Sequence, residues 1–281
     1  MLRIIVDGSA DMPDGWAEAY QLDILPMPIQ IGNTTYYQGE DLTPDLFYQL
    51  IADEEAHPTS AAPSPTRIKA FIERVSEIGD TVLSLNVSGK MSSTISMVQH
   101  AANDLKEKIK VITFDSKAGS AALAFLAREA RLRDEAGETI DEILEQLSDM
   151  REKLMVVLTL DSLEFAYRSG RVGALKVALS SFLKIKPIII LQEGFLNLAG
   201  MVRSRQKSLE RLVFEIKEKF GMEAIKVAIV HAQDLDTAEV LQDMVEKALN
   251  CTETIFTNLS ISVVANLGPK TVGIVALPER I

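Results

Sequence analysis

The chain turns from strand to helix at VSGKMSST, residues 87–94. The apolar run TVLSL at 81–85 predicts a buried strand before this turn, and ISMVQHAA at 95–102 predicts a helix after it. The three hydroxyl residues at 92–94 therefore fall where a helix begins, a position at which such side chains cap free backbone N–H groups. These N–H groups and the helix dipole also favour an anion. The alternative is an ordinary cap that binds no ligand.

The same turn contains a fragment of a different motif, because Ser88, Gly89 and Lys90 resemble part of a phosphate-binding loop. That loop requires the pattern G-x-x-x-x-G-K-[ST]. Ser84 occupies the position of the first glycine, and Met91 follows the lysine in place of Ser or Thr. The sequence therefore argues against an NTP-binding P-loop at this turn.

Strands and helices alternate on both sides of the turn through the first half of the chain. The apolar patterns predict strands at 2–6, 81–87 and 109–114, and helices at 16–20, 44–55, 65–78, 92–108, 118–134 and 140–151. Two further strands, 25–31 and 34–37, flank Gly32-Asn33 and predict a hairpin. Alternation of this kind favours an α/β fold with a doubly wound parallel sheet.

The second half continues the α/β pattern from residue 154. It predicts strands at 154–160, 187–191, 225–230, 253–256 and 272–277, a short hairpin at 195–198, and helices that follow Asp161 and Lys207 or span 174–183 and 237–249. Asp161 with Glu164 has the spacing of a helix cap. We therefore expect two α/β domains, 1–153 and 154–281.

Composition limits the possible functions. The 281 residues carry a net charge of −11, which argues against nucleic acid because such binding depends on neutralising phosphates. No apolar stretch is long enough to span a membrane, and the first residues enter a strand directly, without a secretory signal. A single cysteine, Cys251, suits a reducing cytoplasm. Three histidines without metal-ligand spacing predict no metal site.

Polar clusters follow three of the predicted strands: 7–11, 87–94 and 115–116. Open α/β sheets bind ligands at the carboxyl ends of their parallel strands. We expect these clusters to converge at one edge of the sheet. A fourth polar segment at 57–65 ends in Ser64-Pro65, which predicts a capped helix start.

Taken together in this order, the segments resemble the DegV family of bacterial lipid-binding proteins over nearly the whole chain. The matching pieces are DGSAD at 7–11, SAAPSP at 60–65, SGKMSST at 88–94, DS at 115–116, RSGR at 168–171, KPI at 186–188, RSRQK at 203–207, HAQD at 231–234, and GP at 268–269 with Gly273. The resemblance implies a long-chain fatty acid as ligand, with its acyl chain in an apolar cavity between sheet and helices.

The resemblance also implies how the head group is held. Ser60 and Ser92 match the two hydroxyl residues that hydrogen-bond the fatty acid carboxylate in the family. Ser93 lies in the same motif as Ser92, and Asn266 lies two residues before Gly268-Pro269, at a place that is near the head group in the family. Residues expected to support this head-group site are Ser9, Thr94, Asp115 and Gly268.

The chain departs from the family pattern at several of these places. Asn266 stands where the family usually has a histidine, and Lys270 replaces the second glycine of the G-P-G motif. Ser93 replaces a glycine, and Ala62 replaces a glutamine. Asparagine donates a hydrogen bond but does not exchange a proton near neutral pH.

The family includes fatty-acid-binding subunits of bacterial fatty acid kinase, so the resemblance implies a kinase catalytic subunit as partner. Arg171, Arg203 and Arg205 are then expected to dock this partner and its phosphate, or else to form a solvated basic face. ATP would reach the complex only through the partner, and we expect no cofactor and no catalytic residue in this chain. Two alternatives remain: a lipid sensor or reservoir without a kinase partner, and a hydrolase with Ser92 or Ser9 as nucleophile.

Overall fold

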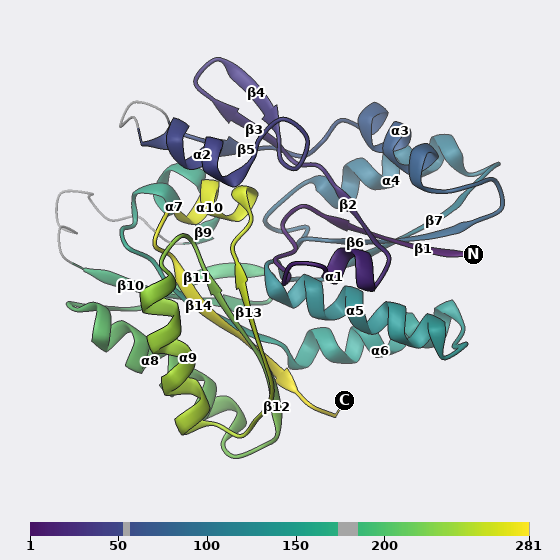
Figure 1. Cartoon of the computed structure of the whole chain (residues 1–281). Helices are drawn as coiled ribbons and strands as arrows, with labels where there is room; N and C mark the ends of the chain where they lie inside the picture. Colours follow the sequence, from purple (N-terminus) through teal and green to yellow (C-terminus); the bar gives the residue numbers. More distant parts are fainter. Residues whose placement is uncertain (53–56, 174–184, 281) are drawn as a thin grey trace.

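The computed structural model describes residues 1–52, 57–173 and 185–280. It has the expected α/β fold, in which two sheets lie on either side of a helical layer (Figure 1). The expected helix at 174–183 lies outside the described residues.

The first sheet has four strands in the order β2-β1-β6-β7. All three pairings are parallel, as the sequence predicted. The bounds of its strands are β1 (Leu2–Asp7), β2 (Leu22–Leu25), β6 (Thr81–Asn86) and β7 (Lys110–Asp115). The side chains of Ile4 and Val6 enter the core on one face, and that of Ile5 enters the core on the other. A strand buried on both faces therefore appears in the sequence as a continuous apolar run.

Helices cover both faces of this sheet, which makes it doubly wound. Helices α3 (Pro65–Val75) and α4 (Thr94–Leu105) pack together on one face, and α5 (Ala121–Glu135) packs on the other. Helix α6 (Ile140–Lys153) lies against α5 and begins at a capping box formed by Thr139 and Glu142. Because α5 contacts both sheets, it is buried nearly all round, and its first turns are rich in alanine.

The second sheet has seven strands in the order β13-β12-β14-β8-β10-β11-β9. Its strands are β8 (Met155–Thr159), β9 (Val172–Gly173), β10 (Lys186–Gln192), β11 (Phe195–Val202), β12 (Ile225–His231), β13 (Cys251–Asn258) and β14 (Val272–Pro278). Helices α8 (Arg205–Phe220) and α9 (Leu235–Ala248) cover one face. Val275 and Leu277 of β14 point to the core shared with α5, and Ile274 points to the core beneath α8 and α9.

A small three-stranded sheet, β4-β3-β5, lies beside the ends of the two large ones. Strands β3 (Pro28–Ile31) and β4 (Thr34–Tyr37) form the expected hairpin, and β5 (Thr59–Ser60) pairs with β3. Two short helices, α1 (Trp16–Ala19) and α2 (Pro44–Ile51), complete this part of the chain.

Several expected boundaries were wrong. Asp161 does not cap the next helix, since α7 (Glu164–Ser169) begins after Leu163 and Asp161 instead pairs with Lys186. The hairpin strand expected at 195–198 extends to Val202, because β11 pairs with β10 along its whole length. Helix α10 (Ile261–Leu267) was not predicted. The seven residues of α10 are too few for a clear helical period, so the fold around it decides its conformation.

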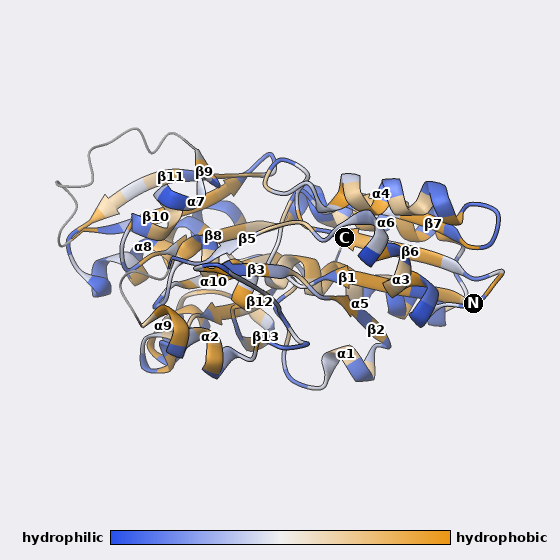
Figure 2. Ribbon diagram, turned by 90° about the horizontal axis from the view of Figure 1, so that it is seen from above, coloured by the Kyte–Doolittle hydropathy of each residue, from blue (hydrophilic) through white to orange (hydrophobic). Residues whose placement is uncertain are grey.

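Buried apolar side chains from both halves form one large core cluster around α5. Figure 2 shows apolar segments concentrated on the strands and on the inner sides of the helices. The domain boundary expected near residue 153 falls at the end of α6, between the two sheets, and stays a prediction. In the parts of the chain that the structure describes, no helix combines the length and the apolar character needed to cross a membrane.

Candidate functional site

The polar clusters at the ends of β1, β6 and β7 meet at one edge of the first sheet, as expected. The Val87 N–H donates to Asp7 Oδ2 at 2.6 Å, and the Gly89 N–H donates to Asp115 Oδ1 at 3.2 Å. The Ser120 N–H donates to Ser9 O at 2.8 Å, so the start of α5 closes over the same edge.

A cavity of 420 Å³ opens beside this edge, between the two large sheets and α10. Its volume lies in the range of about 300–1,000 Å³ found for small-molecule sites. The apolar part of its wall comes from many separate segments: Met27, Ala61, Ala62, Val87, Met91, Val156, Leu158, Leu191, Leu196, Val263 and Leu267. The polar part is mostly serine, with two cations and one amide: Ser9, Ser60, Ser92, Ser93, Ser96, Ser120, Ser262, Lys90, Arg171 and Asn266.

One part of the polar wall is tied into the protein. Ser9 donates its hydroxyl to Asp7, and Ser120 donates its hydroxyl to Asp11. Asp11 also accepts the Ser260 N–H at 2.7 Å, just before α10. We call these five residues the anchored rim, because they join β1, α5 and α10.

The two carboxyl groups of the anchored rim are buried, and their pKa values reflect this. Burial raises the pKa of Asp7 above its ordinary value, although hydrogen bonds from Ser9 and Val87 oppose the shift. Burial likewise raises the pKa of Asp11 to about 6, against the hydrogen bonds from Ser120 and Ser260. Desolvation disfavours the charged form of a carboxyl group, which gives both shifts their direction.

A second part of the polar wall contains Ser60, Ser92 and Asn266, which we call the head-group wall. Asn266 lies in the last turn of α10, and its Nδ2 donates to Ser60 Oγ at 2.8 Å. Two residues expected to share one site are thus in direct contact, although 206 positions separate them in the chain.

Ser92 does not cap the following helix. Helix α4 begins at Thr94, and Ser93 takes the N-cap position without a side-chain hydrogen bond. Ser92 Oγ instead accepts the Thr94 N–H at 3.2 Å and lies 2.8 Å from Thr94 Oγ1. Ser92 and Ser93 line the cavity, while Thr94 is fully buried behind them.

Asp115 and Gly268 support the wall and do not line it. Asp115 holds the backbone N–H groups of Gly89 and Lys117, which fixes the loops after β6 and β7. Gly268 ends α10 with φ +86°, and a Cβ there would lie 2.9 Å from Phe165 Cδ2. Phe165 therefore packs beneath the end of α10 and is absent from the cavity wall.

The turn between β10 and β11 closes the cavity from the C-terminal half. Ser88 Oγ donates to Gly194 O at 2.8 Å, which joins this turn to the loop after β6. Gly194 has φ +82°, and a Cβ there would lie only 2.6 Å from Ser88 Oγ. The adjacent Phe195 stacks with the Lys90 ammonium, 4.8 Å from its ring centroid, and does not line the cavity.

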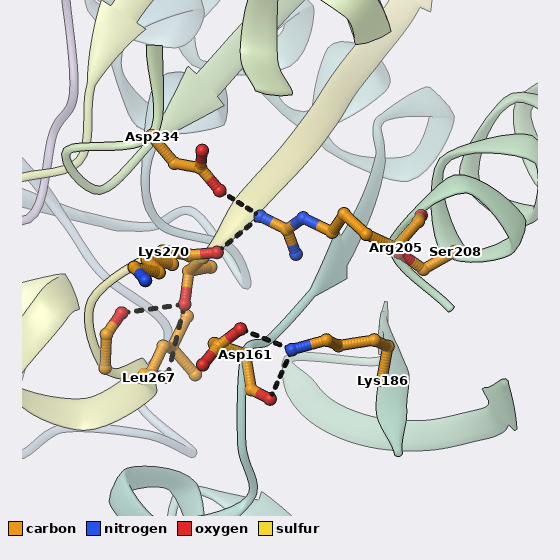
Figure 3. A network of polar contacts seen from close by, with 9 residues as sticks. Asp161, Lys186, Arg205, Ser208, Asp234, Leu267 and Lys270 are labelled. Atoms are coloured by element: carbon orange, nitrogen blue, oxygen red, sulfur yellow. Dashed lines mark hydrogen bonds and ion pairs between the residues drawn. The ribbon is translucent and has the colours of Figure 1, made fainter. Parts of the chain in front are cut away.

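The three arginines expected to dock a partner have different positions. Arg171 lines the cavity, and Arg203 is exposed on the surface. Arg205 was expected to be exposed, but it is half-buried and donates at 2.6 Å both to Asp234 Oδ2 and to the Lys270 carbonyl (Figure 3). These contacts tie α8 to the loops that precede α9 and β14.

Sequence reasoning predicted Asn266 but missed Ser262 on the same helix and the contribution of β8 to the cavity. Ser262 and Asn266 are spaced i, i+4 and therefore share a face of α10, but only recognition of that helix would have paired them. Val156 and Leu158 of β8 also line the cavity. They belong to the same apolar cluster as the core, so their sequence pattern does not distinguish them from core residues. His231, whose role the sequence left open, is buried against Phe256, away from the cavity wall, and burial lowers its pKa.

With this geometry in view, comparison with known proteins identifies the family. A family model described as "Uncharacterised protein, DegV family" matches residues 1–279. The chain belongs to the DegV family. A DegV domain-containing protein of Listeria monocytogenes is 27% identical over 240 residues, which cover 85% of this chain and 84% of that protein.

Solved structures of other DegV proteins share the whole fold. The structure of a fatty-acid-binding DegV family protein from Thermus thermophilus has a TM-score of 0.89 at 26% identity and covers 99% of both chains. A hypothetical protein of Thermotoga maritima, whose structure is described as revealing a fatty acid binding function, has a TM-score of 0.85 at 25% identity and covers 99% of both chains.

Proposed function

We propose that this DegV protein binds a long-chain fatty acid in the 420 Å³ cavity, with the carboxyl group at the head-group wall and the acyl chain against the apolar lining. The observation that carries the proposal is the cavity itself, which combines a largely apolar wall with hydroxyl groups gathered at the expected Ser60 and Ser92. The fatty acid binding described for the Thermus and Thermotoga relatives supports the same ligand class.

Burial of the acyl chain supplies most of the affinity in this proposal. Each methylene group transferred from water to an apolar wall contributes about 0.8 kcal/mol. A hydrogen bond from a serine hydroxyl contributes about 0.5–1.5 kcal/mol. Ser60 and Ser92 therefore orient the ligand in the cavity, and the apolar wall retains it.

We further propose that the bound acid is presented to a fatty acid kinase catalytic subunit, which brings its own ATP. The exposed Arg203 and the cavity-lining Arg171 are cations at the surface and wall of a protein with a net charge of −11. Such cations attract an acidic partner or its phosphate. Arg205 is less suited to this role, since its guanidinium already holds Asp234 and the Lys270 carbonyl.

A lipid reservoir without a kinase partner is the second candidate, and Asn266 favours it because an amide does not exchange protons. The hydrolase is the weakest candidate. A serine nucleophile requires a base within hydrogen-bond reach. Among the described residues that line the cavity there is no histidine, and Ser92 Oγ is in contact only with Thr94. Ser9 donates to Asp7, but that carboxyl group also accepts two backbone N–H groups.

Native mass spectrometry of protein purified from a bacterial host tests the binding proposal. We expect a co-purified mass in the fatty acid range. Ser60→Ala and Ser92→Ala should each weaken retention about two- to tenfold, the equivalent of one hydrogen bond. Ser148→Ala, whose hydroxyl bonds only Leu144 O within α6, is the matched control and should retain the wild-type amount. Unchanged retention in the double variant would refute the head-group assignment.

The kinase proposal has a separate test. A fatty acid kinase catalytic subunit, ATP and the lipid-loaded protein are mixed, and formation of acyl phosphate is followed. Arg203→Ala should lower the rate of transfer without changing lipid retention. Lipid binding without transfer, even in the wild-type chain, would favour the reservoir.

A further inference from the structure

The amide of Asn266 has one orientation in this fold. Its Nδ2 lies 2.8 Å from Ser60 Oγ and 2.7 Å from the Ser262 carbonyl oxygen. A carbonyl oxygen only accepts hydrogen bonds, so the atom that faces Ser262 O must be the nitrogen. The usual uncertainty between the two ends of an amide is thereby removed.

Both N–H hydrogens of Asn266 are used by these two contacts, which leaves its Oδ1 as a free acceptor. Oδ1 is enclosed, and none of the described residues donates a hydrogen bond to it. An enclosed acceptor without a donor costs about 1–3 kcal/mol. Asn266 itself lines the cavity, so a bound molecule that displaces the side chains enclosing Oδ1 can supply the missing donor.

The two serines of the head-group wall differ from Asn266, because they can offer hydrogen-bond donors. Ser60 Oγ accepts from Asn266, so its own hydrogen remains available for a ligand. Ser92 Oγ accepts the Thr94 N–H, and when Thr94 Oγ1 donates across their 2.8 Å contact the Ser92 hydrogen is available as well. The head-group wall thus offers two O–H donors and one acceptor.

We propose that Asn266 selects a lipid whose head group itself donates a hydrogen bond, so that a fatty acid is bound as the neutral carboxylic acid and not as the carboxylate. A carboxylate has only acceptor oxygens and would set a negative oxygen against Asn266 Oδ1. The neutral acid suits these groups in kind, because its carbonyl oxygen accepts from a serine hydroxyl and its O–H donates to Oδ1. This inference rests on the proposed fatty acid binding, because it concerns the same ligand at the same wall. It favours the reservoir over the kinase partner, since phosphoryl transfer uses the ionised carboxylate as nucleophile.

The charges near the cavity have both signs. Asp7 and Asp11 lie one residue behind the wall, each bonded to a lining serine, and both disfavour a further negative charge. Lys90 and Arg171 line the cavity and act in the opposite direction. Of the elements packed closely on α10, β3 and β5 carry no charged side chain.

Helix α7 is the remaining neighbour of α10, and it carries Glu164 and Arg168, which pair with each other at 3.2 Å. The start of α4 beside Ser92 also favours an anion. The hydrogen-bonding pattern at Asn266 therefore opposes part of the surrounding charge.

The carbon-13 resonance of a fatty acid labelled at its carboxyl carbon tests the inference, because its position differs between acid and carboxylate. The protein is loaded with the labelled acid and titrated from about pH 5 to pH 8. We expect the bound resonance to keep the position of the neutral acid at a pH where the free acid is ionised. Since only the neutral fraction binds, the apparent Kd should rise about tenfold per pH unit above the pKa of the free ligand.

Two variants and two further lipids complete the experiment. Asn266→His supplies a donor in place of Oδ1 and should move the bound resonance to the carboxylate position. Asn103→His, the same exchange at an exposed site on α4, should leave it unchanged. A fatty alcohol of equal chain length should bind with no dependence on pH, and the methyl ester, which has no donor, should bind more weakly than the alcohol.

The possible failures are distinguishable. A bound resonance that stays at the carboxylate position throughout the titration overturns the inference and leaves the proposed function intact. Absence of any bound signal for acid, alcohol and ester alike overturns the proposed function. Equal affinity for the alcohol and the ester contradicts a donor-selective wall.

Discussion

The anchored rim and the head-group wall face the same cavity and contain the same kind of side chain, yet their serines differ. Ser9 and Ser120 donate their hydroxyl hydrogens to buried carboxyl groups. Ser60 Oγ accepts a hydrogen bond from Asn266, and its hydrogen remains available. Ser92 Oγ accepts the Thr94 N–H, and its hydrogen is available when Thr94 Oγ1 donates to it. A polar lining residue is therefore not by itself a ligand contact, and the direction of its hydrogen bond decides which role it has.

This comparison predicts that the anchored rim governs stability. Asp7→Ala should leave the Val87 and Ser9 N–H groups without an acceptor in the interior. We expect a loss of about 3 kcal/mol or more in the free energy of unfolding. Denaturant unfolding measures this, with Ser92→Ala as the comparison from the head-group wall. Equal losses in the two variants would break the distinction.

Filling the cavity should weaken lipid binding more than it destabilises the fold. Val263 lies on the cavity wall and is half-buried, so Val263→Trp places a bulky ring where the acyl chain would lie. We expect lipid affinity to fall at least about tenfold, or about 1.4 kcal/mol. Val240→Trp, at an exposed position on α9, is the control. Full lipid retention in Val263→Trp would mean that the chain occupies another path.

The pH dependence of stability sharpens the comparison further. The pKa of Asp11 is about 6 in the folded protein against an ordinary value of 3.8, because of burial. Between these two values the folded chain keeps a proton that the unfolded chain has released, so stability falls as the pH rises through this window.

Asp11→Asn removes this titration. Relative to the wild type, the free energy of unfolding of the variant should therefore increase as the pH rises from about 4 to about 6. Denaturant unfolding at a series of pH values measures the difference, and Asp104→Asn makes the same chemical change at an exposed site. A constant difference between Asp11→Asn and the wild type across the window would contradict the assignment.

The smallest expected effects separate two arginines near the start of α8. Arg205→Ala removes contacts to Asp234 and to the Lys270 carbonyl, and should cost about 1–2 kcal/mol of unfolding free energy. Arg203→Ala, at an exposed position, should change it by less than about 0.5 kcal/mol. Thermal unfolding of the two variants side by side is the measurement. The reverse order would show that Arg205 is not a structural residue.

The sequence pattern predicted most helices and strands, because neighbouring residues determine them. The run at 81–85 is apolar on both faces, so it forms a buried parallel strand, and Thr139 with Glu142 caps α6 as its spacing indicates. Asp161 misled the prediction, since a nearby lysine on β10 competes with the helix for its carboxylate. Helix α10 was missed because its seven residues owe their conformation to the elements packed around them.

The sequence by itself determined the α/β fold, the parallel first sheet, the family and the identity of the polar residues near the cavity. Only the tertiary structure decided which hydroxyl groups already donate a hydrogen bond within the protein. Ser9 donates to Asp7, two residues away, whereas Ser60 accepts from Asn266, 206 residues away. The tertiary structure also decided that Asn266 presents an acceptor, since the Ser262 carbonyl fixes the amide. Hydrogen-bond direction depends on every neighbour in space, and a linear pattern does not contain that information.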